Sequence, residues 1–211
     1  MKLFWTPASP FTRKVCVVAR ETRQWHEIEV LPTIWPLEWG YQTVSFTPGL
    51  VGANPLARIP ALVTDEGETL GDSTIACMFL NERSRGPKVI PNGPAKWRMW
   101  SLYAVADGAL EAQVAMRAES LRPQEQRSPD FLAKQRDRLE RCFDTFEARA
   151  DELHGDASLA NITVAIACGY QLWREWLTDF SPGRPELAAW YQRFSSRPSL
   201  RDTEPRETPE A

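Results

Sequence analysis

Histidine and cysteine are scarce in this chain of 211 residues, and it has no long apolar run. The two histidines, His26 and His154, are too few for a typical zinc site or a serine–histidine triad. The longest apolar stretch, Val164–Cys168, is far shorter than the roughly 20 residues that cross a bilayer. The sequence therefore predicts no resident metal ion and no membrane-spanning helix.

The four cysteines, Cys16, Cys77, Cys142 and Cys168, are widely spaced and form no Cys-x-x-Cys pair. Each lies in an apolar, helix-like stretch, which favours buried reduced thiols over disulfides or metal ligands. The segment 1–7 has no apolar core of signal-peptide length. We therefore expect a cytoplasmic protein.

Excess charge of either sign is also missing, because 25 basic and 28 acidic residues leave a net charge of −3 and a pI near 5.6. Nothing here favours binding to nucleic-acid phosphates or to an anionic membrane. Tryptophan, in contrast, is abundant, with 9 residues. So many indole rings need a large core, an aromatic pocket or an interface.

Residues 1–84 alternate strand and helix signals. A strand–helix–strand unit comes first, and a strand–strand–helix unit follows a long irregular connection over 31–58. A right-handed crossover makes the first two strands parallel, whereas the later hairpin is antiparallel, so we expect a mixed sheet. The expected elements are strands at 3–5, 26–31, 60–64 and 68–70, with helices at 10–23 and 73–83.

Strand signals stop after the Pro- and Gly-bearing segment 84–94, which reads as a linker. We expect helices at 97–121, 129–153, 159–177 and 185–194, followed by a loosely ordered polar tail from residue 201. The sequence thus predicts an α/β domain over 1–84, a linker over 85–94 and an all-α helical bundle over 95–211.

Short motifs carry a resemblance along nearly the whole chain, up to about residue 205. Together they resemble the cytosolic glutathione S-transferase family, particularly its bacterial members with serine or cysteine before Pro-Phe. The motifs are Ser9-Pro10-Phe11-x-x-Lys14-Val15, Asn54-Pro55-Leu56-Ala57-Arg58-Ile59-Pro60-Ala61-Leu62, Asp72-Ser73, Ala106-Asp107-Gly108, Ser158-Leu159-Ala160-Asn161-Ile162 and Arg197-Pro198-Ser199.

The resemblance implies a thioredoxin-like N-terminal domain that holds glutathione as co-substrate. It also implies a helical C-terminal domain that shapes a pocket for a small apolar electrophile. A homodimer and a role in detoxification are further implications of the family.

Ser9 has two interpretations. As a residue before Pro10 it is an ordinary helix N-cap. The resemblance adds that its hydroxyl donates a hydrogen bond to the glutathione sulfur. Ser9 is not a plausible nucleophile, because no histidine lies nearby in the sequence to take its proton. The two roles, cap and thiolate donor, are compatible.

Pro60 is either a strand-initial proline or, as the resemblance implies, the second residue of a cis peptide. In the second case the backbone of Ile59 pairs with the cysteinyl part of glutathione. Asp72 and Ser73 are either plain helix caps or the site for the γ-glutamyl group, with Asp72 on its ammonium and Ser73 on its carboxylate.

Phe11 belongs to the same implied glutathione site. The glycyl carboxylate also needs a donor, for which Arg58 and the loop residues Trp35, Trp39 and Gln42 are candidates.

The cluster of Trp97, Trp100 and Tyr103 fits either the core and dimer contacts or a substrate pocket. The resemblance implies that this helix faces the glutathione sulfur, and Trp100, Tyr103 and Asp107, which recur at helical spacing, are then candidates for the wall of the electrophile pocket. Trp5, at the end of the first strand, is a candidate for its floor. Lys14 and the neighbouring Arg13 are expected on a solvated helix face.

Ser158 and Asn161 resemble the family's buried capping box, which normally ends in aspartate. Asn161 is a neutral acceptor that can still cap the helix. We expect this element to serve folding and not catalysis.

Three functions fit this sequence. The first is transfer of the glutathione thiolate to an electrophile. The second is a glutathione-binding or structural module without turnover. The third, thiol–disulfide reduction, prefers a cysteine at the position of Ser9, and Cys16 lies well inside the helix.

Overall fold

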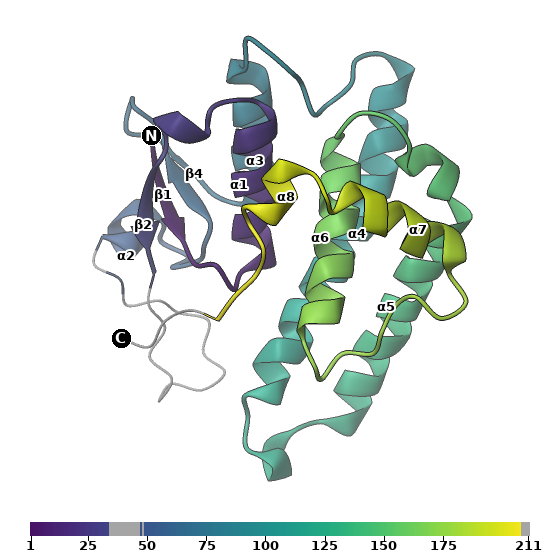
Figure 1. Ribbon diagram of the computed structural model, residues 1–211. Coiled ribbons are helices and arrows are strands. Elements are labelled where there is room, and N and C mark those ends of the chain that lie inside the picture. The colour runs from purple at the N-terminus through teal and green to yellow at the C-terminus, as the bar shows by residue number, and fades with distance from the viewer. Residues whose placement is uncertain (34–46, 48, 208–211) are drawn as a thin grey trace.

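The computed structural model describes residues 1–33, 47 and 49–207. Figure 1 shows two halves side by side, a sheet with its helices and a bundle of longer helices. Among the described residues, no helix is both long and apolar enough to cross a membrane.

The first half is built on a four-stranded sheet with the strand order β2-β1-β3-β4. Strand β1 is parallel to β2 and antiparallel to β3, and β3 is antiparallel to β4. This is the mixed sheet that the sequence predicts, in the thioredoxin-like arrangement that the resemblance implies. The strands are β1 (Lys2–Trp5), β2 (Glu29–Pro32), β3 (Ala61–Val63) and β4 (Thr69–Leu70).

The helices of this half are α1 (Pro10–Glu21), α2 (Leu50–Ala53) and α3 (Ser73–Arg83). The segment expected to be one strand over 26–31 is divided, because a 3-10 turn, η1 (Trp25–Glu27), precedes β2. The backbone N–H of Glu27 bonds to the Gln24 carbonyl at 3.0 Å. Because this N–H is used in the turn, it is not available to a neighbouring strand, and β2 begins only at Glu29.

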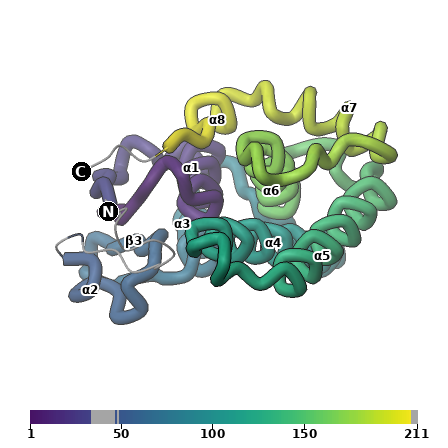
Figure 2. Tube along the Cα trace, turned by 90° about the horizontal axis from the view of Figure 1, so that it is seen from below, coloured from purple at the N-terminus to yellow at the C-terminus, as the bar shows by residue number. Residues whose placement is uncertain are grey.

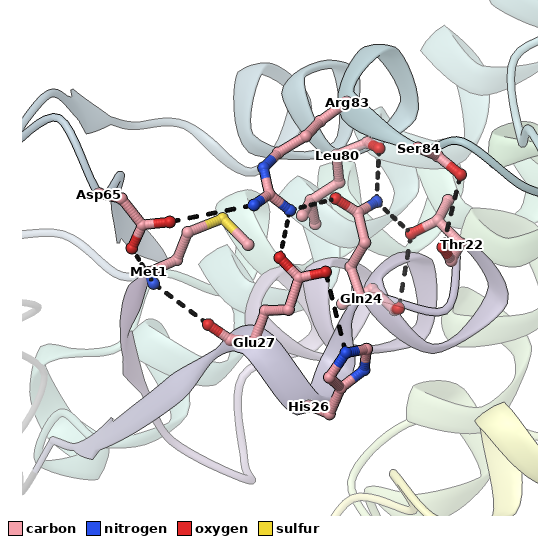
Figure 3. A network of polar contacts seen from close by, with 10 residues as sticks. Met1, Thr22, Gln24, His26, Glu27, Asp65, Leu80, Arg83 and Ser84 are labelled. Atoms are coloured by element: carbon pink, nitrogen blue, oxygen red, sulfur yellow. Dashed lines mark hydrogen bonds and ion pairs between the residues drawn. The ribbon is translucent and has the colours of Figure 1, made fainter.

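A polar network joins the C-terminal ends of α1 and α3 (Figure 3). Gln24, just after α1, donates from Nε2 to the Leu80 carbonyl at 2.7 Å and accepts from Arg83 at 3.1 Å. Arg83 also pairs with Glu27. Because α1 and α3 end together, they run in the same direction and begin together at the opposite end of the sheet half.

The second half is helical, as predicted. Its longest member is α4, and the most buried is α6, in which 13 of 15 residues are buried. A helix that is apolar on all sides belongs inside a core. The elements are α4 (Pro94–Ser120), η3 (Gln124–Gln126), α5 (Pro129–Ala148), η4 (Ala150–Leu153), α6 (Leu159–Trp173), α7 (Pro185–Phe194) and α8 (Pro198–Arg201).

One apolar core continues through both halves, from Leu3 in β1 and Val17 in α1 to Leu110 in α4 and Ile166 in α6. Helix α1 lies between the sheet and α6, as the views from the side and from below both show (Figures 1 and 2). The C-terminal α8 returns to pack against α1. Because α1 is surrounded by other helices, its charged side chains need partners within the protein.

Candidate functional site

Helix α1 begins at Ser9, which is a true N-cap. Its backbone is extended (φ −88°, ψ 120°), and its Oγ accepts a hydrogen bond from the Thr12 N–H at 3.2 Å. Pro10 follows at the first helical position. The Ser9 oxygen acts here as an acceptor, so the hydroxyl proton remains available for an acceptor outside the helix.

Helix α3 begins at Asp72, an exposed N-cap of a different charge. Its Oδ1 accepts from the N–H groups of Thr74 (2.7 Å) and Ile75 (3.1 Å). Two of the N–H groups that the sequence offered to a γ-glutamyl carboxylate are therefore already bonded within the chain. The adjacent Ser73 is buried, with 3% of its surface exposed.

The Ile59–Pro60 peptide is cis, as the resemblance implies. Arg58, just before it, is exposed, and its carbonyl accepts from Asn54 Nδ2 at 2.8 Å. The other candidates for the glycyl carboxylate, the loop residues Trp35, Trp39 and Gln42, lie outside the described residues.

A buried polar chain connects α1, α4 and α3 next to these helix starts. Lys14 Nζ donates to Asp107 Oδ1 at 2.5 Å and to the Tyr103 hydroxyl at 2.7 Å. The Tyr103 hydroxyl also lies 2.7 Å from the Thr74 hydroxyl. An ammonium group can only donate, so Tyr103 accepts from Lys14 and keeps its own proton for Thr74.

Burial raises the pKa of Tyr103 above its ordinary value, and the neighbouring Asp107 raises it further. The phenol is therefore neutral and remains a donor. Trp100 stacks edge-on against its ring, with the centroids 5.1 Å apart. The structure thus brings together Trp100, Tyr103 and Asp107, the three residues proposed from the sequence for one wall of α4.

Lys14 does not lie on a solvated face, as the sequence pattern suggested, because its side chain is fully buried. Its ammonium lies 4.8 Å from the centre of the Tyr103 ring and 5.6 Å from that of Phe11. Helix α1 packs against α3 of its own half and against α6 of the helical half. The buried ammonium of Lys14 is therefore neutralised within the protein, by Asp107 of α4.

Arg13 is likewise buried, with 7% of its surface exposed. It faces α8, where its Nη2 donates to the Leu200 carbonyl at 3.1 Å. Burial lowers the pKa of Arg13. The expectation of a solvated face was wrong here because α8 folds back over α1.

Trp5 lies elsewhere. It lines a cavity of about 180 Å³ on the side of α1 that carries Arg13 and Cys16. Residues 202–204 and 206 of the C-terminal segment line the same cavity. The segment after 201, expected as a loosely ordered tail, therefore lies against the sheet half as far as the structure describes it.

The start of α6 is capped by Ser158, whose Oγ accepts from the Asn161 N–H at 3.1 Å. Asn161 does not act as the expected acceptor. Its Nδ2 donates to the carbonyls of Leu153 (3.1 Å) and Asp156 (3.3 Å). The amide thus ties α6 to the end of η4, which a carboxylate could not do.

All four cysteines are free. Cys16 is 2% exposed, and burial raises its pKa to about 12. A thiol in that state is not a nucleophile at neutral pH. In the part of the chain that the structure describes, no group of three His, Cys, Asp or Glu residues could hold a metal ion.

Sequence reasoning missed one charged group, at the far end of α4 and α6. It consists of Arg117, Arg174 and Glu207, of which the last two form an ion pair. A signal was present, since neither arginine has a carboxylate three or four residues away with which to pair along its own helix.

Comparison with known proteins gives one consistent result. Residues 8–83 match the family described as glutathione S-transferase, N-terminal domain. The uncharacterized GST-like protein YibF of Escherichia coli K12 is 32% identical over 210 residues, which cover 97% of this chain and 98% of that protein.

Solved structures agree. A glutathione transferase family member from Pseudomonas fluorescens Pf-5 with bound glutathione is 36% identical, covers 98% of this chain and 99% of its own, and has a TM-score of 0.88. The structure with bound S-(propanoic acid)-glutathione gives 36% identity, coverage of 98% and 100%, and a TM-score of 0.86. A glutathione S-transferase from Methylobacillus flagellatus KT with bound glutathione is 30% identical, with coverage of 97% and 99% and a TM-score of 0.82.

Proposed function

Because the chain belongs to the glutathione S-transferase family, we propose that it is an enzyme that transfers glutathione to a small electrophile. Ser9 is the catalytic residue in this proposal. The observation that carries it is the geometry of the Ser9 hydroxyl, which accepts from Thr12 and retains its proton at the start of α1. With that proton the hydroxyl donates a hydrogen bond to the glutathione sulfur, which stabilises the thiolate after the thiol proton has left to water, in the turn that the bacterial Ser-Pro-Phe resemblance implies.

A hydrogen bond from Ser9, together with the N-terminal end of α1, can supply the free energy needed to lower the thiol pKa of glutathione. A thiol pKa near 8.5 must fall by about 2 units, or roughly 2.7 kcal/mol, for the thiolate to dominate at neutral pH. A hydrogen bond to a charged group contributes about 1.5–3 kcal/mol. The N-terminal end of α1 adds about 0.3–1 kcal/mol.

Once the thiolate is formed, the reaction requires that the electrophilic carbon lie within reach of the sulfur. The thiolate forms a C–S bond with the electrophilic carbon, and a leaving group departs with its electron pair. In an addition to a double bond, the carbon next to the new bond takes a proton from water instead. A relative was solved with S-(propanoic acid)-glutathione, in which the sulfur carries a second group, and this supports such a product.

Glutathione lies along the edge where α1 and α3 begin. The backbone of Ile59, before the cis peptide to Pro60, pairs with the cysteinyl part. Asp72 binds the γ-glutamyl ammonium through its second carboxylate oxygen, and Ser73 binds the carboxylate. Phe11 completes the wall, and the exposed Arg58 reaches the glycyl end.

The reacting part of the electrophile is apolar and lies against Trp100 and Tyr103, with Asp107 at the same wall of α4. Trp5 lines the separate cavity on the side of α1 that carries Arg13, so it is left out of the proposed electrophile pocket.

The proposal includes the organisation of the chain. Residues 1–84 form the glutathione-binding domain, 85–94 the linker and 95–211 the helical domain. Two copies form a homodimer, which the 74% exposed Trp97 at the start of α4 supports. Four free cysteines support a cytoplasmic location, and removal of reactive compounds is the fitting role.

Two alternatives predict different results. A module without turnover would bind glutathione without lowering its thiol pKa. A thiol–disulfide reductase would need a reactive cysteine, and the buried Cys16 disfavours it.

The test compares two serines with the same local structure. Ser128 precedes Pro129 and accepts from the Phe131 N–H at 3.2 Å, as Ser9 does from Thr12. Conjugation of glutathione to a nitroaromatic halide is measured for Ser9→Ala and for Ser128→Ala. We expect kcat/KM to fall about 100-fold for Ser9→Ala only. Equal activity in both variants would reject the role of Ser9.

A further inference from the structure

Two arginines come together where α4 and α6 run side by side. Gln113 Nε2 on α4 donates to the Ala167 carbonyl at 2.9 Å and to Gln171 Oε1 at 2.8 Å on α6. Arg117 lies one turn after Gln113, and Arg174 directly follows the end of α6. Both guanidinium groups are thus carried to the same end of the helix pair.

Arg117 is also placed on the face of α4 that carries Tyr103. It lies 14 residues after Tyr103, which is about four turns at 3.6 residues per turn, so the two side chains share a face of α4. Tyr103 contacts α1 and α3 on that face. Arg117 therefore lies between α6 and the side of the cleft that the proposed reaction uses.

Arg174 is buried, with 7% of its surface exposed, and is held in a fixed orientation. Its guanidinium stacks 3.6 Å from the centre of the Trp173 ring and 5.3 Å from that of Tyr170. It pairs with Glu207, whose side chain is 67% exposed, while its Nε is buried without a partner. The ring contacts fix the arginine, whereas its counter-charge comes from an exposed residue near the end of the described chain.

Arg117 is half-buried, and its guanidinium makes no hydrogen bond or ion pair with any residue that the structure describes, although its carbonyl accepts from Ser120 Oγ. Burial lowers its pKa, and the positive charge of Arg174 lowers it further. Two neighbouring cations thus share the single carboxylate of Glu207. The two guanidinium groups carry two positive charges against one carboxylate, so a second anion would be stabilised in this partly buried site.

The segment that holds Glu207 connects the pair with the turn before Ser9. Arg206, the residue before Glu207, lines the cavity that Thr6 and Pro7 also line. The Ser9 N–H bonds to the Thr6 carbonyl at 3.3 Å. The chain just before Glu207 therefore passes the Thr6–Pro7 turn that leads into Ser9, and in Figure 1 the C-terminal segment descends from α8 toward the start of α1.

We propose that Arg117 and Arg174 bind a carboxylate on the electrophile, and that Glu207 occupies this site until the substrate displaces it. The inference rests on the proposed transferase function and names its substrate class: small electrophiles, such as unsaturated acids, that carry a carboxylate away from the reacting carbon. The planar guanidinium groups suit a carboxylate, and the half-buried Trp173 ring takes the apolar part. Glu207 shows that the site accepts this chemical group.

The test measures binding, so that it does not depend on finding the natural electrophile. The probes are S-(ω-carboxyalkyl)glutathiones with chains of increasing length, each compared with its neutral amide, and the readout is Kd by calorimetry. At the best chain length we expect the wild-type protein to prefer the carboxylate by about tenfold. Arg117→Gln should reduce this preference to below about threefold.

Glu207→Gln should strengthen binding of the carboxylate probes by about threefold and leave the amides unchanged, because the competing anion is removed. Arg98→Gln, an exposed arginine at the other end of α4, is the matched control and should bind as the wild type does. An equal Kd for carboxylate and amide at every length overturns the inference, as does a preference that survives Arg117→Gln. If glutathione binds normally in that case, the transferase proposal stands; if neither glutathione nor any probe binds, both proposals fail.

Discussion

The starts of α1 and α3 lie at the same end of the sheet half, and their N-caps differ in charge. Ser9 caps α1 with a neutral oxygen that takes one N–H, whereas Asp72 caps α3 with a carboxylate that takes two. A neutral cap leaves the positive end of its helix for an outside anion, and an acidic cap compensates it. The same end of the molecule can therefore hold a thiolate at α1 and an ammonium at α3.

The two starts are also connected. Lys14 of α1 bonds to Tyr103, and Tyr103 bonds to Thr74 in the first turn of α3. The connection passes through α4, which carries the proposed electrophile wall. The four changes that follow make the two starts alike, break the connection between them, or test the other end of α1.

The largest effect is expected when α1 receives the cap of α3. Ser9→Asp keeps the helix capped, because aspartate is as good an N-cap as serine. Its negative charge opposes the glutathione thiolate, so kcat/KM should fall about 1,000-fold, below the value for Ser9→Ala. Initial rates and thermal unfolding, measured together, separate this loss from misfolding. Activity at or above that of Ser9→Ala would show that charge at this cap is unimportant.

The connection through Lys14 comes next. Lys14→Met removes a buried ammonium and leaves the partly exposed Asp107 without its partner, so the free energy of unfolding should fall by about 2 kcal/mol. Urea denaturation checks this value. Lys134→Met, an exposed lysine of α5, should change it by less than about 0.5 kcal/mol. If Lys14→Met and Lys134→Met behave alike, the buried chain contributes nothing to stability.

The reverse exchange gives α3 the cap of α1. Asp72→Ser preserves a side-chain acceptor for the helix but removes the charge proposed to bind the γ-glutamyl ammonium. Glutathione should bind about tenfold more weakly while the thiol pKa of the bound molecule stays lowered. Calorimetry gives the affinity. Unchanged affinity would assign Asp72 to capping alone.

The smallest effect concerns the C-terminal end of α1. Burial raises the pKa of Glu21, but hydrogen bonds from Arg197 and Ser199 outweigh it, so the pKa is lowered on balance. A carboxylate with a lowered folded-state pKa stabilises the protein above its unfolded-state pKa, and this contribution is lost as the pH falls through the folded value.

Glu21→Gln should therefore cost about 1 kcal/mol at pH 7. The difference from the wild type should shrink as the pH falls from about 5 toward 3. Urea denaturation across this range, with the exposed Glu82→Gln as control, measures it. A difference that does not depend on pH would mean that the charge of Glu21 is not involved.

Local signals in the sequence were enough for most of the fold. Ser9 and Asp72 predict helix starts because their side chains can cap the first N–H groups, and Pro10 suits the first helical position. The structure has helices that begin at these positions. The cis peptide before Pro60, in contrast, came from the family resemblance, because the sequence alone offers a strand-initial proline as an equal alternative.

Burial of charged residues could not be predicted from periodicity. Lys14 and Arg13 are polar in sequence but enclosed in structure, because α4 and α8 pack on opposite sides of α1. Periodicity describes one helix and its own faces, whereas these contacts join residues about 90 and 190 positions apart. The pairing of Arg174 with Glu207 likewise joins residues far apart in the sequence, because the C-terminal segment folds back onto the end of α6.

The most direct test of the central claim, that the neutral cap at Ser9 stabilises a thiolate, is an ultraviolet titration of glutathione bound to the protein. The thiolate absorbance is followed from about pH 5 to 9 for the wild type, Ser9→Ala and the matched cap variant Ser128→Ala. We predict a bound thiol pKa about 2 units below the free value near 8.5 in the wild type and in Ser128→Ala, and a return toward the free value in Ser9→Ala. An unshifted thiol in the wild type, or a lowered pKa that persists in Ser9→Ala, would contradict it.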